Sequence, residues 1–296
     1  MGNLLSFTVA YLSAKQRGGF VRLRIEDLDP DRSKQCFSDA LLRDLDWFGF
    51  EWEGEVVRQS ERTDAYREAF EKLQTQGLLY PCFCTRADLH AANAPHFGEE
   101  LVYPNTCKSL STDERDAAEA ALWHAARRKP ARRVIVPSKP YSFHDGFQGL
   151  CTYNLTECSG DFIVQRADGV FAYQLAVVVD DAESGVNEVV RGVDLLNSVP
   201  RQLFLQERLG LEHPAYFHVP LLVDAEGRRL SKRNADASLQ CLIEKEKRRP
   251  EEILGHLAWL AGIVGSSTPR SLDDLIREAN LDVLKGKREL LWQPLT

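Results

Sequence analysis

GDFIVQRADGVFAYQLAVVVDDAESGVNEVVRGVDLL, residues 160–196, is the stretch that best predicts the fold. Residues 162–164 are a short β-branched and aromatic run that stops at the turn signal ADG. Residues 171–179 are almost wholly apolar until two aspartates close them, and residues 188–192 predict a second short strand. A long apolar run that ends in charges is typical of a buried element that opens into a cleft. Because open α/β sheets bind ligands beyond their strand ends, the stretch predicts an α/β fold with its site here.

The composition is that of an ordinary globular chain, with 296 residues, 44% hydrophobic and 27% charged. No apolar run approaches the length of a membrane span, and residues 1–19 lack the basic start and the cleavage site of a signal peptide. Seven cysteines, an odd number in a long chain, favour a reducing compartment over a disulfide framework. We therefore expect a cytoplasmic protein with no membrane partner.

The formal net charge of −7 excludes a strongly basic nucleic-acid-binding chain. It leaves room for a local basic face, because phosphate contacts depend on where lysines and arginines lie. Residues 127–133 and 245–249 are basic runs that could form such a face. Solvated helix ends explain either run equally well.

The rest of the chain alternates helical and strand patterns. Helices are predicted where apolar residues recur at helical spacing and glycine follows as a stop signal. The predicted helices span residues 5–12, 35–48, 62–76, 112–128, 199–209, 250–261 and 272–279. The predicted strands span residues 20–25, 133–136, 141–145 and 218–223. The strand at 20–25 runs into three carboxylates and a proline, which indicates a functional loop or a helix start.

Cysteines 82 and 84, with Cys107 downstream, are typical of a small metal site. Zinc takes four donors in near-tetrahedral geometry, so a fourth ligand is needed. The candidates for the fourth ligand are Tyr103, His90 and His96. Three buried structural cysteines without a metal are the alternative. A bound ion would be structural, since protein groups fill every position and binding offsets the cost of ordering a loop with little core.

The pattern DFIVxRxDGxxxYQLAxVxDD at residues 161–181, followed by VxRGxDLL and by LSKR at residues 230–233, resembles the class I aminoacyl-tRNA synthetases specific for glutamate. The chain is most similar to the glutamyl-Q tRNA(Asp) synthetase family, the short form without an anticodon-binding domain. The resemblance covers residues 1 to about 262. It implies a class I, Rossmann-like parallel sheet with a small zinc-binding insertion and a helical C-terminal part.

The resemblance also implies how the chain divides into domains. Residues 1–78 and 111–235 would form the Rossmann-like catalytic domain with an acceptor-binding-like insertion. Residues 79–110 would form the zinc-binding insertion, and residues 236–296 a helical C-terminal subdomain. Relatives continue after the LSKR-like loop into a separate anticodon-binding region. The residues that follow here are fewer than the roughly 100–150 of a typical domain, so we expect no anticodon reading of that kind.

The N-terminus departs from the family pattern. Relatives start with a strand that contacts glutamate, followed by a His-x-Gly-(His or Asn) turn, and only Gly2 and Asn3 match the end of that turn. We therefore expect the first strand and the first histidine to be missing, through a start codon placed too late or through decay of the gene. Gly2 and Asn3 would still bind ATP, because a helix N-terminus offers free N–H groups to phosphate.

The family's glutamate-contact positions fall on Glu26, Tyr173 and Arg191. Arg191 can pair with a carboxylate in a bidentate way, Tyr173 offers a hydroxyl, and Glu26 can attract the ammonium. Taken alone, Arg191 is better explained as a surface ion pair, Tyr173 as core packing and Glu26 as a helix cap, and the alignment of the motifs favours the glutamate contacts instead. Lys232, in the LSKR segment, matches the family's KMSKS-type loop, which implies ATP binding and a catalytic role in neutralising the triphosphate.

The resemblance implies activation of L-glutamate by ATP and Mg²⁺ to glutamyl-adenylate without tRNA. It then implies transfer of glutamate to queuosine in the anticodon of tRNA(Asp). The family's Cys-x-Cys…Tyr-x-x-x-Cys pattern favours Tyr103 as the ligand that completes one structural zinc site with Cys82, Cys84 and Cys107. We expect a monomer. The alternatives are an inactive, N-terminally truncated remnant and a fragment of a conventional glutamyl-tRNA synthetase.

Overall fold

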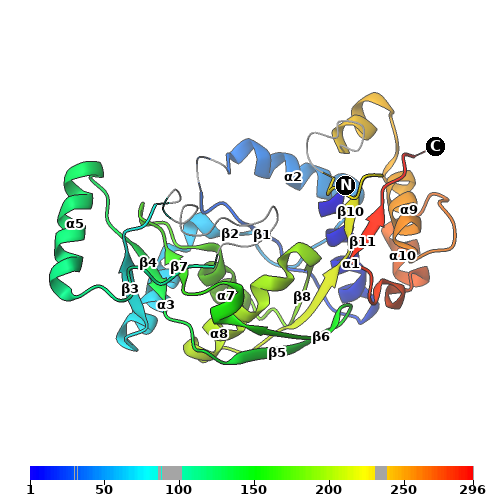
Figure 1. The fold of residues 1–296 in the computed structure, drawn as a ribbon. Helices are drawn as coiled ribbons and strands as arrows, with labels where there is room; N and C mark the ends of the chain where they lie inside the picture. Colours follow the sequence, from blue (N-terminus) through cyan, green and yellow to red (C-terminus); the bar gives the residue numbers. More distant parts are fainter. Residues whose placement is uncertain (30, 32, 86–87, 89–101, 231–238, 296) are drawn as a thin grey trace.

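A four-stranded sheet with the order β6-β5-β9-β8 lies at the base of the molecule (Figure 1). The computed structural model describes residues 1–29, 31, 33–85, 88, 102–230 and 239–295. The neighbours β8 (Glu188–Gly192), β9 (Ala215–Val219) and β5 (Pro140–Asp145) run parallel, and β6 (Gly149–Asn154) pairs antiparallel with β5. The carboxyl ends of β8, β9 and β5 therefore meet at one edge, where ligands bind in open α/β sheets.

Helices α7 (Tyr173–Glu183), α8 (Val199–Leu209) and α3 (Thr63–Thr75) pack together into one hydrophobic core. The apolar run predicted as a buried element is α7, in which every residue from Leu175 to Asp181 is buried. A helix that is apolar on all sides is stable only when it is covered on all sides. Helix α8 ends at Gly210, whose φ of 71° is the left-handed conformation that glycine adopts readily.

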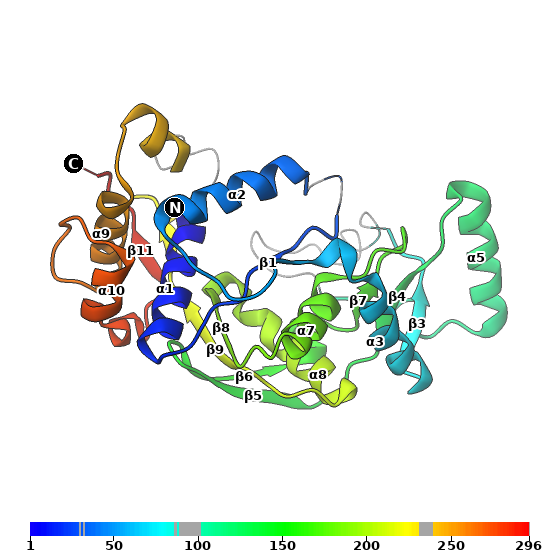
Figure 2. The ribbon, with the colours of Figure 1, turned by 180° about the vertical axis from the view of Figure 1, so that it is seen from behind.

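A second core joins the two ends of the chain. It contains residues of α1 (Gly2–Gln16), α2 (Gln35–Phe48), α9 (Pro250–Ala261) and α10 (Leu272–Glu278). Figure 2 shows α1 between the sheet and the C-terminal helices. In this core Leu12 is fully buried. The N-terminal helix thus depends for its burial on residues that lie more than two hundred positions later in the chain.

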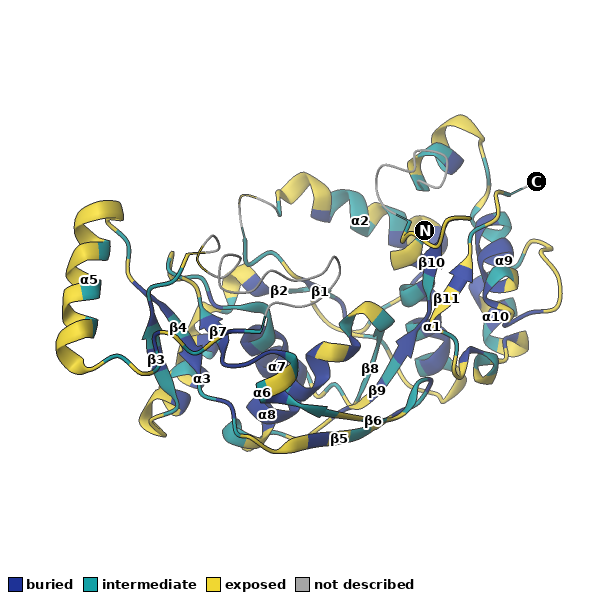
Figure 3. Cartoon of the chain, viewed as in Figure 1, coloured by how far each residue is buried: buried dark blue, intermediate teal, exposed yellow. Residues whose placement is uncertain are grey.

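An antiparallel sheet of β3 (Leu79–Cys82), β4 (Ala131–Val134) and β7 (Phe162–Gln165) lies at the other end of the molecule. Helix α5 (Thr112–Ala126) projects from this sheet and has no buried residue, as Figure 3 shows by its mostly exposed surface. A capping box at Ser111 and Glu114 satisfies N–H groups at its first turn.

Shorter elements complete the description. Two-residue strands β1 (Arg24–Ile25) and β2 (Val57–Arg58) pair in parallel, as do β10 (Leu221–Val223) and β11 (Glu289–Leu291). Short helical turns lie at η1 Gln59–Glu61, α6 Leu155–Cys158, η2 Val193–Ser198, η4 Cys241–Lys245 and η5 Leu281–Leu284. No helix in the described part of the chain combines the length and apolarity needed to cross a bilayer.

Two strand predictions were wrong in extent. The strand expected at 20–25 pairs only at Arg24 and Ile25. The strand expected at 218–223 is two strands, β9 and β10, which belong to different sheets on either side of Pro220. Proline has no N–H to donate to a ladder, so a sheet readily ends at it. The predicted helix at 35–48 has the bounds of α2.

Candidate active site and candidate metal centre

Arg191 lies near the carboxyl end of β8 and is held by three acceptors. Its Nε donates to Nε2 of His218 at 3.1 Å. Its Nη2 donates to the Leu195 carbonyl at 3.3 Å and to Oε1 of Gln202 at 3.0 Å. These contacts leave Nη1 as the nitrogen for which no described residue serves as acceptor. The guanidinium therefore has one orientation before any ligand arrives.

Tyr173, the first residue of α7, lies within the electrostatic influence of both Glu26 and Arg191. Burial raises the pKa of Tyr173, the Glu26 carboxylate raises it further, and the Arg191 guanidinium opposes the rise. Hydrogen bonds connect Arg191 to the same helix, because Gln202, which accepts from Arg191, donates to Oε1 of Gln174, next to Tyr173, at 3.0 Å. Glu26, in the segment after β1, is connected to helix α7 in a similar way, through Arg24 and Asp181.

Arg24 adds a second cation to the same region. Its Nη1 donates to Asp181 at 2.5 Å and its Nη2 lies 3.3 Å from Oε1 of Glu26. Burial raises the pKa of Asp181, although the charges of Arg24 and Arg191 act against that rise. Alternating carboxylates and guanidinium groups therefore line the region, which suits a zwitterionic ligand with an ammonium and carboxylates.

The loop that carries Glu26 is anchored on both sides of the site. Asp27 accepts hydrogen bonds from the N–H and the hydroxyl of Ser60, both at 2.9 Å. Asp29 pairs with Arg166 at 2.9 Å. The acidic residues of this loop thus divide their roles. Asp27 and Asp29 bind neighbouring segments, while the Glu26 side chain is 43% exposed and can contact a ligand.

The two predicted ATP-binding elements are described to different extents. Gly2 and Asn3 form the exposed first turn of α1. The other end of α1 contacts the beginning of β8 through Ser13 and Glu188 at 2.5 Å, so α1 starts toward the carboxyl end of that strand. Lys232 lies in residues 231–238, outside the described residues.

Arg229 and Leu230, the last described residues before Lys232, contact residues close to Arg191. Arg229 forms an ion pair with Asp194, three positions beyond Arg191 in the sequence. The Leu230 N–H donates to the Leu222 carbonyl at 3.0 Å, which ties the same segment to β10. The segment leading to Lys232 therefore departs from the neighbourhood of Arg191.

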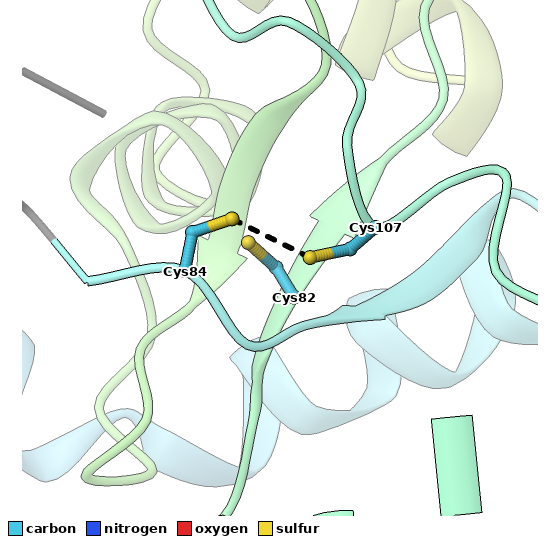
Figure 4. A group of neighbouring side chains, drawn as sticks. All are labelled: Cys82, Cys84 and Cys107. Atoms are coloured by element: carbon cyan, nitrogen blue, oxygen red, sulfur yellow. Dashed lines mark hydrogen bonds between the residues drawn. The ribbon is translucent and has the colours of Figure 1, made fainter. Parts of the chain in front are cut away.

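Three cysteine sulfurs converge at the end of β3. Those of Cys82, Cys84 and Cys107 all lie within 4.8 Å of one another, and Figure 4 shows them pointing at a common centre. The sulfurs of Cys84 and Cys107 are 3.5 Å apart. The Tyr103 hydroxyl lies 3.6 Å from the Cys82 sulfur and 3.7 Å from the Cys84 sulfur. A tetrahedral ion with Zn–S bonds of about 2.3 Å separates two sulfurs by about 3.8 Å. Three thiolates and one phenolate therefore fit zinc.

Local hydrogen bonds prepare Cys107 for ligation. Burial opposes ionisation of this thiol, but hydrogen bonds from Tyr103 and from the Phe83 N–H outweigh it and lower the pKa of Cys107. Burial raises the pKa of Cys84 to about 12, so that thiol needs a cation to ionise. The competing ligands His90 and His96 lie in residues 89–101, outside the described residues.

Arg133 covers one side of the cysteine cluster. Its Nε donates to the Cys82 sulfur at 3.1 Å, and its Cζ lies 3.6 Å from the centroid of the Tyr103 ring. Its Nη1 also donates a hydrogen bond to the Asp161 carbonyl at 2.7 Å, which fixes the guanidinium, and the whole side chain is buried. A buried cation in contact with two candidate ligands stabilises their anionic forms.

Comparisons with known proteins assign the chain to a family. A family model described as "tRNA synthetases class I (E and Q), catalytic domain" matches residues 1–280. A glutamyl-Q tRNA(Asp) synthetase of Nitratidesulfovibrio vulgaris is 42% identical over 93% of this chain and 86% of its own length. One from Geobacter sulfurreducens is 43% identical over 99% of this chain and 86% of its own. The chain belongs to the glutamyl-Q tRNA(Asp) synthetase family.

Membership in this family makes the chain a ligase of the class I aminoacyl-tRNA synthetase type, which implies use of ATP. A solved glutamate tRNA ligase from Elizabethkingia meningosepticum has the same fold, with a TM-score of 0.79 over 99% of this chain at 24% identity. The chain spans 64% of the length of that ligase. The predicted α/β, class I fold is thereby confirmed.

Sequence reasoning missed several residues that hold the candidate site in place. His218, Asp145 and Gln202 support Arg191, while Arg24 and Asp181 flank Glu26 and Tyr173. A signal for one of them was present, because His218 is the only polar side chain in the apolar run FHVPLLV. Buried polar groups need partners, so such a residue indicates a hidden network.

Proposed function

We propose that this chain activates L-glutamate with ATP to form glutamyl-adenylate, without help from tRNA. The observation that supports the proposal is that hydrogen bonds connect both Glu26 and Arg191 to helix α7, which begins at Tyr173. Glu26 attracts the glutamate ammonium, Arg191 binds a carboxylate through Nη1, and the Tyr173 hydroxyl orients the ligand. The relatives, which are glutamyl-Q tRNA(Asp) synthetases, support the same amino acid.

ATP would bind between the start of α1 and the loop of Lys232. The free N–H groups at Gly2 and Asn3 suit phosphate oxygens, and Lys232, with Mg²⁺ carried by the nucleotide, would offset the charge that builds as the glutamate carboxylate attacks the α-phosphorus. Pyrophosphate then leaves. Each element in this account holds or neutralises an anion, which is the main task of a protein in phosphoryl chemistry.

The second step would transfer glutamate from the adenylate to the queuosine base in the anticodon loop of tRNA(Asp). The relatives' names supply this acceptor. We further propose that the enzyme acts as a cytoplasmic monomer, with residues 1–78 and 111–235 as the catalytic domain and residues 236–296 as a helical subdomain. One structural zinc ion would be held in the insertion at residues 79–110 by Cys82, Cys84, Tyr103 and Cys107.

The test of the first step is ATP–pyrophosphate exchange with L-glutamate and no tRNA. The wild-type chain should exchange label with glutamate and not with glutamine or aspartate. Lys232→Ala should abolish exchange while the circular dichroism spectrum stays that of the wild type. Arg191→Ala should abolish glutamate binding in calorimetry. Exchange that requires tRNA, or an Arg191→Ala variant that binds glutamate normally, would contradict the proposal.

The test of the second step locates the label. Radioactive glutamate incubated with ATP and queuosine-containing tRNA(Asp) should become attached to the anticodon-loop fragment after ribonuclease digestion. The same tRNA with guanosine in place of queuosine is the matched control and should stay unlabelled. Label at the acceptor 3′ end would instead indicate a conventional glutamyl-tRNA synthetase.

A further inference from the structure

Three side chains form a continuous hydrogen-bonded row across the parallel sheet. Arg191 of β8 lies directly opposite His218 of β9 in the strand register, and Asp145 ends β5, the next strand across. His218 Nε2 is 3.1 Å from Arg191 Nε, and His218 Nδ1 is 2.6 Å from Asp145 Oδ2. Both His218 and Asp145 are fully buried. The row therefore runs from the interior outward to the group assigned to the ligand.

The neighbours decide which nitrogen of His218 carries the proton. A guanidinium nitrogen can only donate, so Nε2 of His218 must accept from Arg191 and cannot carry hydrogen. The proton then lies on Nδ1 and is donated to the Asp145 carboxylate. This assignment follows from the hydrogen-bond network, which is the usual basis for a histidine tautomer. A protonated His218 would place two cations in contact.

Asp145 is itself held from the other side. Its Oδ1 accepts from the N–H groups of Phe147 at 3.0 Å, Gln148 at 2.8 Å and His218 at 3.1 Å. Only Oδ2 faces the imidazole. At Gly146, between the strand and this turn, an added Cβ would lie 1.9 Å from the Phe217 ring, so the turn is packed too closely for any side chain. The carboxylate therefore has no freedom to exchange its two oxygens.

We propose that His218, oriented by Asp145, is a positioning residue that fixes the Arg191 guanidinium for the glutamate carboxylate. The role rests on the proposed function of Arg191 and makes it more specific. An arginine side chain has several rotatable bonds and loses conformational entropy when a ligand orders it. Because Nε and Nη2 are already bonded to protein acceptors, that cost is met on folding and Nη1 is presented in a fixed direction. His218 does not touch the substrate.

Two substitutions at His218 separate its two bonds. In His218→Gln the longer amide can reach the position of Nε2 and its oxygen can accept from Arg191. In His218→Asn the shorter amide reaches only the position of Nδ1 and can donate to Asp145 but not accept from Arg191. The variants are matched in chemistry and both lose the ring. They differ in whether the hydrogen bond from Arg191 Nε is kept.

The readout is the KM for glutamate and the KM for ATP in pyrophosphate exchange, together with the melting temperature. We expect His218→Asn to raise the glutamate KM by about 10-fold or more, as for loss of a hydrogen bond to a charged group, with the ATP KM unchanged. His218→Gln should raise the glutamate KM less than His218→Asn does. His144→Asn, at the exposed neighbour of Asp145 on β5, is the control and should leave both constants unchanged.

Asp145→Asn tests the tautomer with almost no change in volume. The three N–H donors hold the amide oxygen at Oδ1, so the amide nitrogen faces Nδ1 of His218 and donates to it. The histidine proton is then driven to Nε2, where it opposes the N–H of Arg191, as an asparagine substitution does in the serine-protease triad. We expect a raised glutamate KM and ¹⁵N chemical shifts of His218 that change from the Nδ1–H to the Nε2–H tautomer.

The outcomes distinguish this role from the proposed function. Glutamate KM values equal to wild type in both His218→Asn and Asp145→Asn would overturn the positioning role. Equal rises in both KM values that follow the loss of melting temperature would also overturn it, because they indicate a purely structural pair. If Arg191→Ala itself binds glutamate normally, the proposed glutamate site fails and the positioning role fails with it. Loss of binding in Arg191→Ala alone leaves the proposed function intact.

Discussion

Glu26 and the two aspartates that follow it in the loop show how one acidic segment serves two purposes at the scale of single residues. Asp27 and Asp29 are bonded to Ser60 and Arg166, and they order the backbone. Among the described residues, Glu26 forms one ion pair, with Arg24 at 3.3 Å, and its side chain is 43% exposed. A partly exposed ion pair of this kind contributes little to stability. The Glu26 carboxylate is therefore free to serve a ligand.

Glu26→Gln removes this charge without changing the shape of the side chain. We expect the glutamate KM to rise by about 10-fold, because the substrate ammonium loses a charged hydrogen-bond acceptor, while the melting temperature stays within a degree or so of wild type. Steady-state pyrophosphate exchange measures the first quantity and calorimetry the second. Glu55→Gln, at an exposed position outside the site, serves as the control. An unchanged KM would remove Glu26 from the site.

The His218–Asp145 pair also predicts how stability depends on pH. Burial lowers the pKa of His218, the hydrogen bond to Asp145 opposes this, and the Arg191 charge lowers it again, with Asp194 acting in the raising direction. Between the lowered pKa and the ordinary value of about 6.5, the unfolded chain binds more protons than the folded chain. The free energy of unfolding therefore falls as the pH decreases below about 6.5, by at most about 1.4 kcal/mol per pH unit for this group.

Urea denaturation at a series of pH values from 8 to 5 measures this dependence. The contribution of Asp145, whose pKa is also lowered, appears only below its ordinary value near 3.8 and lies outside that range. In His218→Gln the titrating group is gone, so the slope in this pH range should decrease relative to wild type. Identical slopes in the two proteins would show that His218 does not titrate differently on folding.

At the scale of elements, β4 determines the surroundings of the candidate metal centre. Successive strand residues point to opposite faces, so Arg133 is buried against Cys82 and Tyr103 while Arg132 is not. Three thiolates and a phenolate around a divalent ion leave an excess of negative charge in a poorly solvated place. The guanidinium of Arg133 offsets part of it.

Arg133→Met should weaken zinc binding by about 10- to 100-fold, the usual effect of removing a hydrogen-bond partner of a metal ligand. Competition with a chromophoric chelator measures the affinity, and elemental analysis measures the zinc content. Cys84→Ser should lose the metal altogether, and Arg132→Met should bind like wild type. An Arg133→Met variant with wild-type affinity would contradict the role, and equal zinc content in Cys84→Ser would contradict the site itself.

The sequence predicted helices better than strands, for a physical reason. Helical periodicity is local, so α2 was found with the bounds it has in the structure. Strand pairing is not local, and β11, which pairs with β10 from far along the chain, carries no pattern of its own. The residues of the candidate site also differ in whether local sequence could predict them. The candidate residues Glu26, Tyr173 and Arg191 follow from motifs, whereas Asp145 meets His218 only because β5 and β9 become neighbours.

At the scale of the whole molecule, the core shared by α1, α9 and α10 connects the predicted ATP-binding turn to the C-terminal helices. Leu12→Ala should therefore cost about 2–5 kcal/mol of unfolding free energy, since Leu12 is fully buried and its neighbours come from several elements. Leu150→Ala, at a leucine that is 76% exposed, should change the unfolding free energy by less than about 0.5 kcal/mol. Urea denaturation of both variants measures the difference. Equal effects at the two sites would contradict this account of the core.

The pairing of β11 with β10 has a mechanical consequence. Strand β10 leads directly into the segment that precedes Lys232, and in the described part of the chain β11 is its only ladder partner. The Trp292 N–H extends this pairing with a bond to the Val223 carbonyl at 2.8 Å. Residues near the C-terminus thus hold in place strand β10, which ends shortly before residues 231–238. A bulky fusion placed immediately after Leu291 is expected to weaken the pairing of β10 with β11 and so to lower the pyrophosphate exchange proposed for this chain.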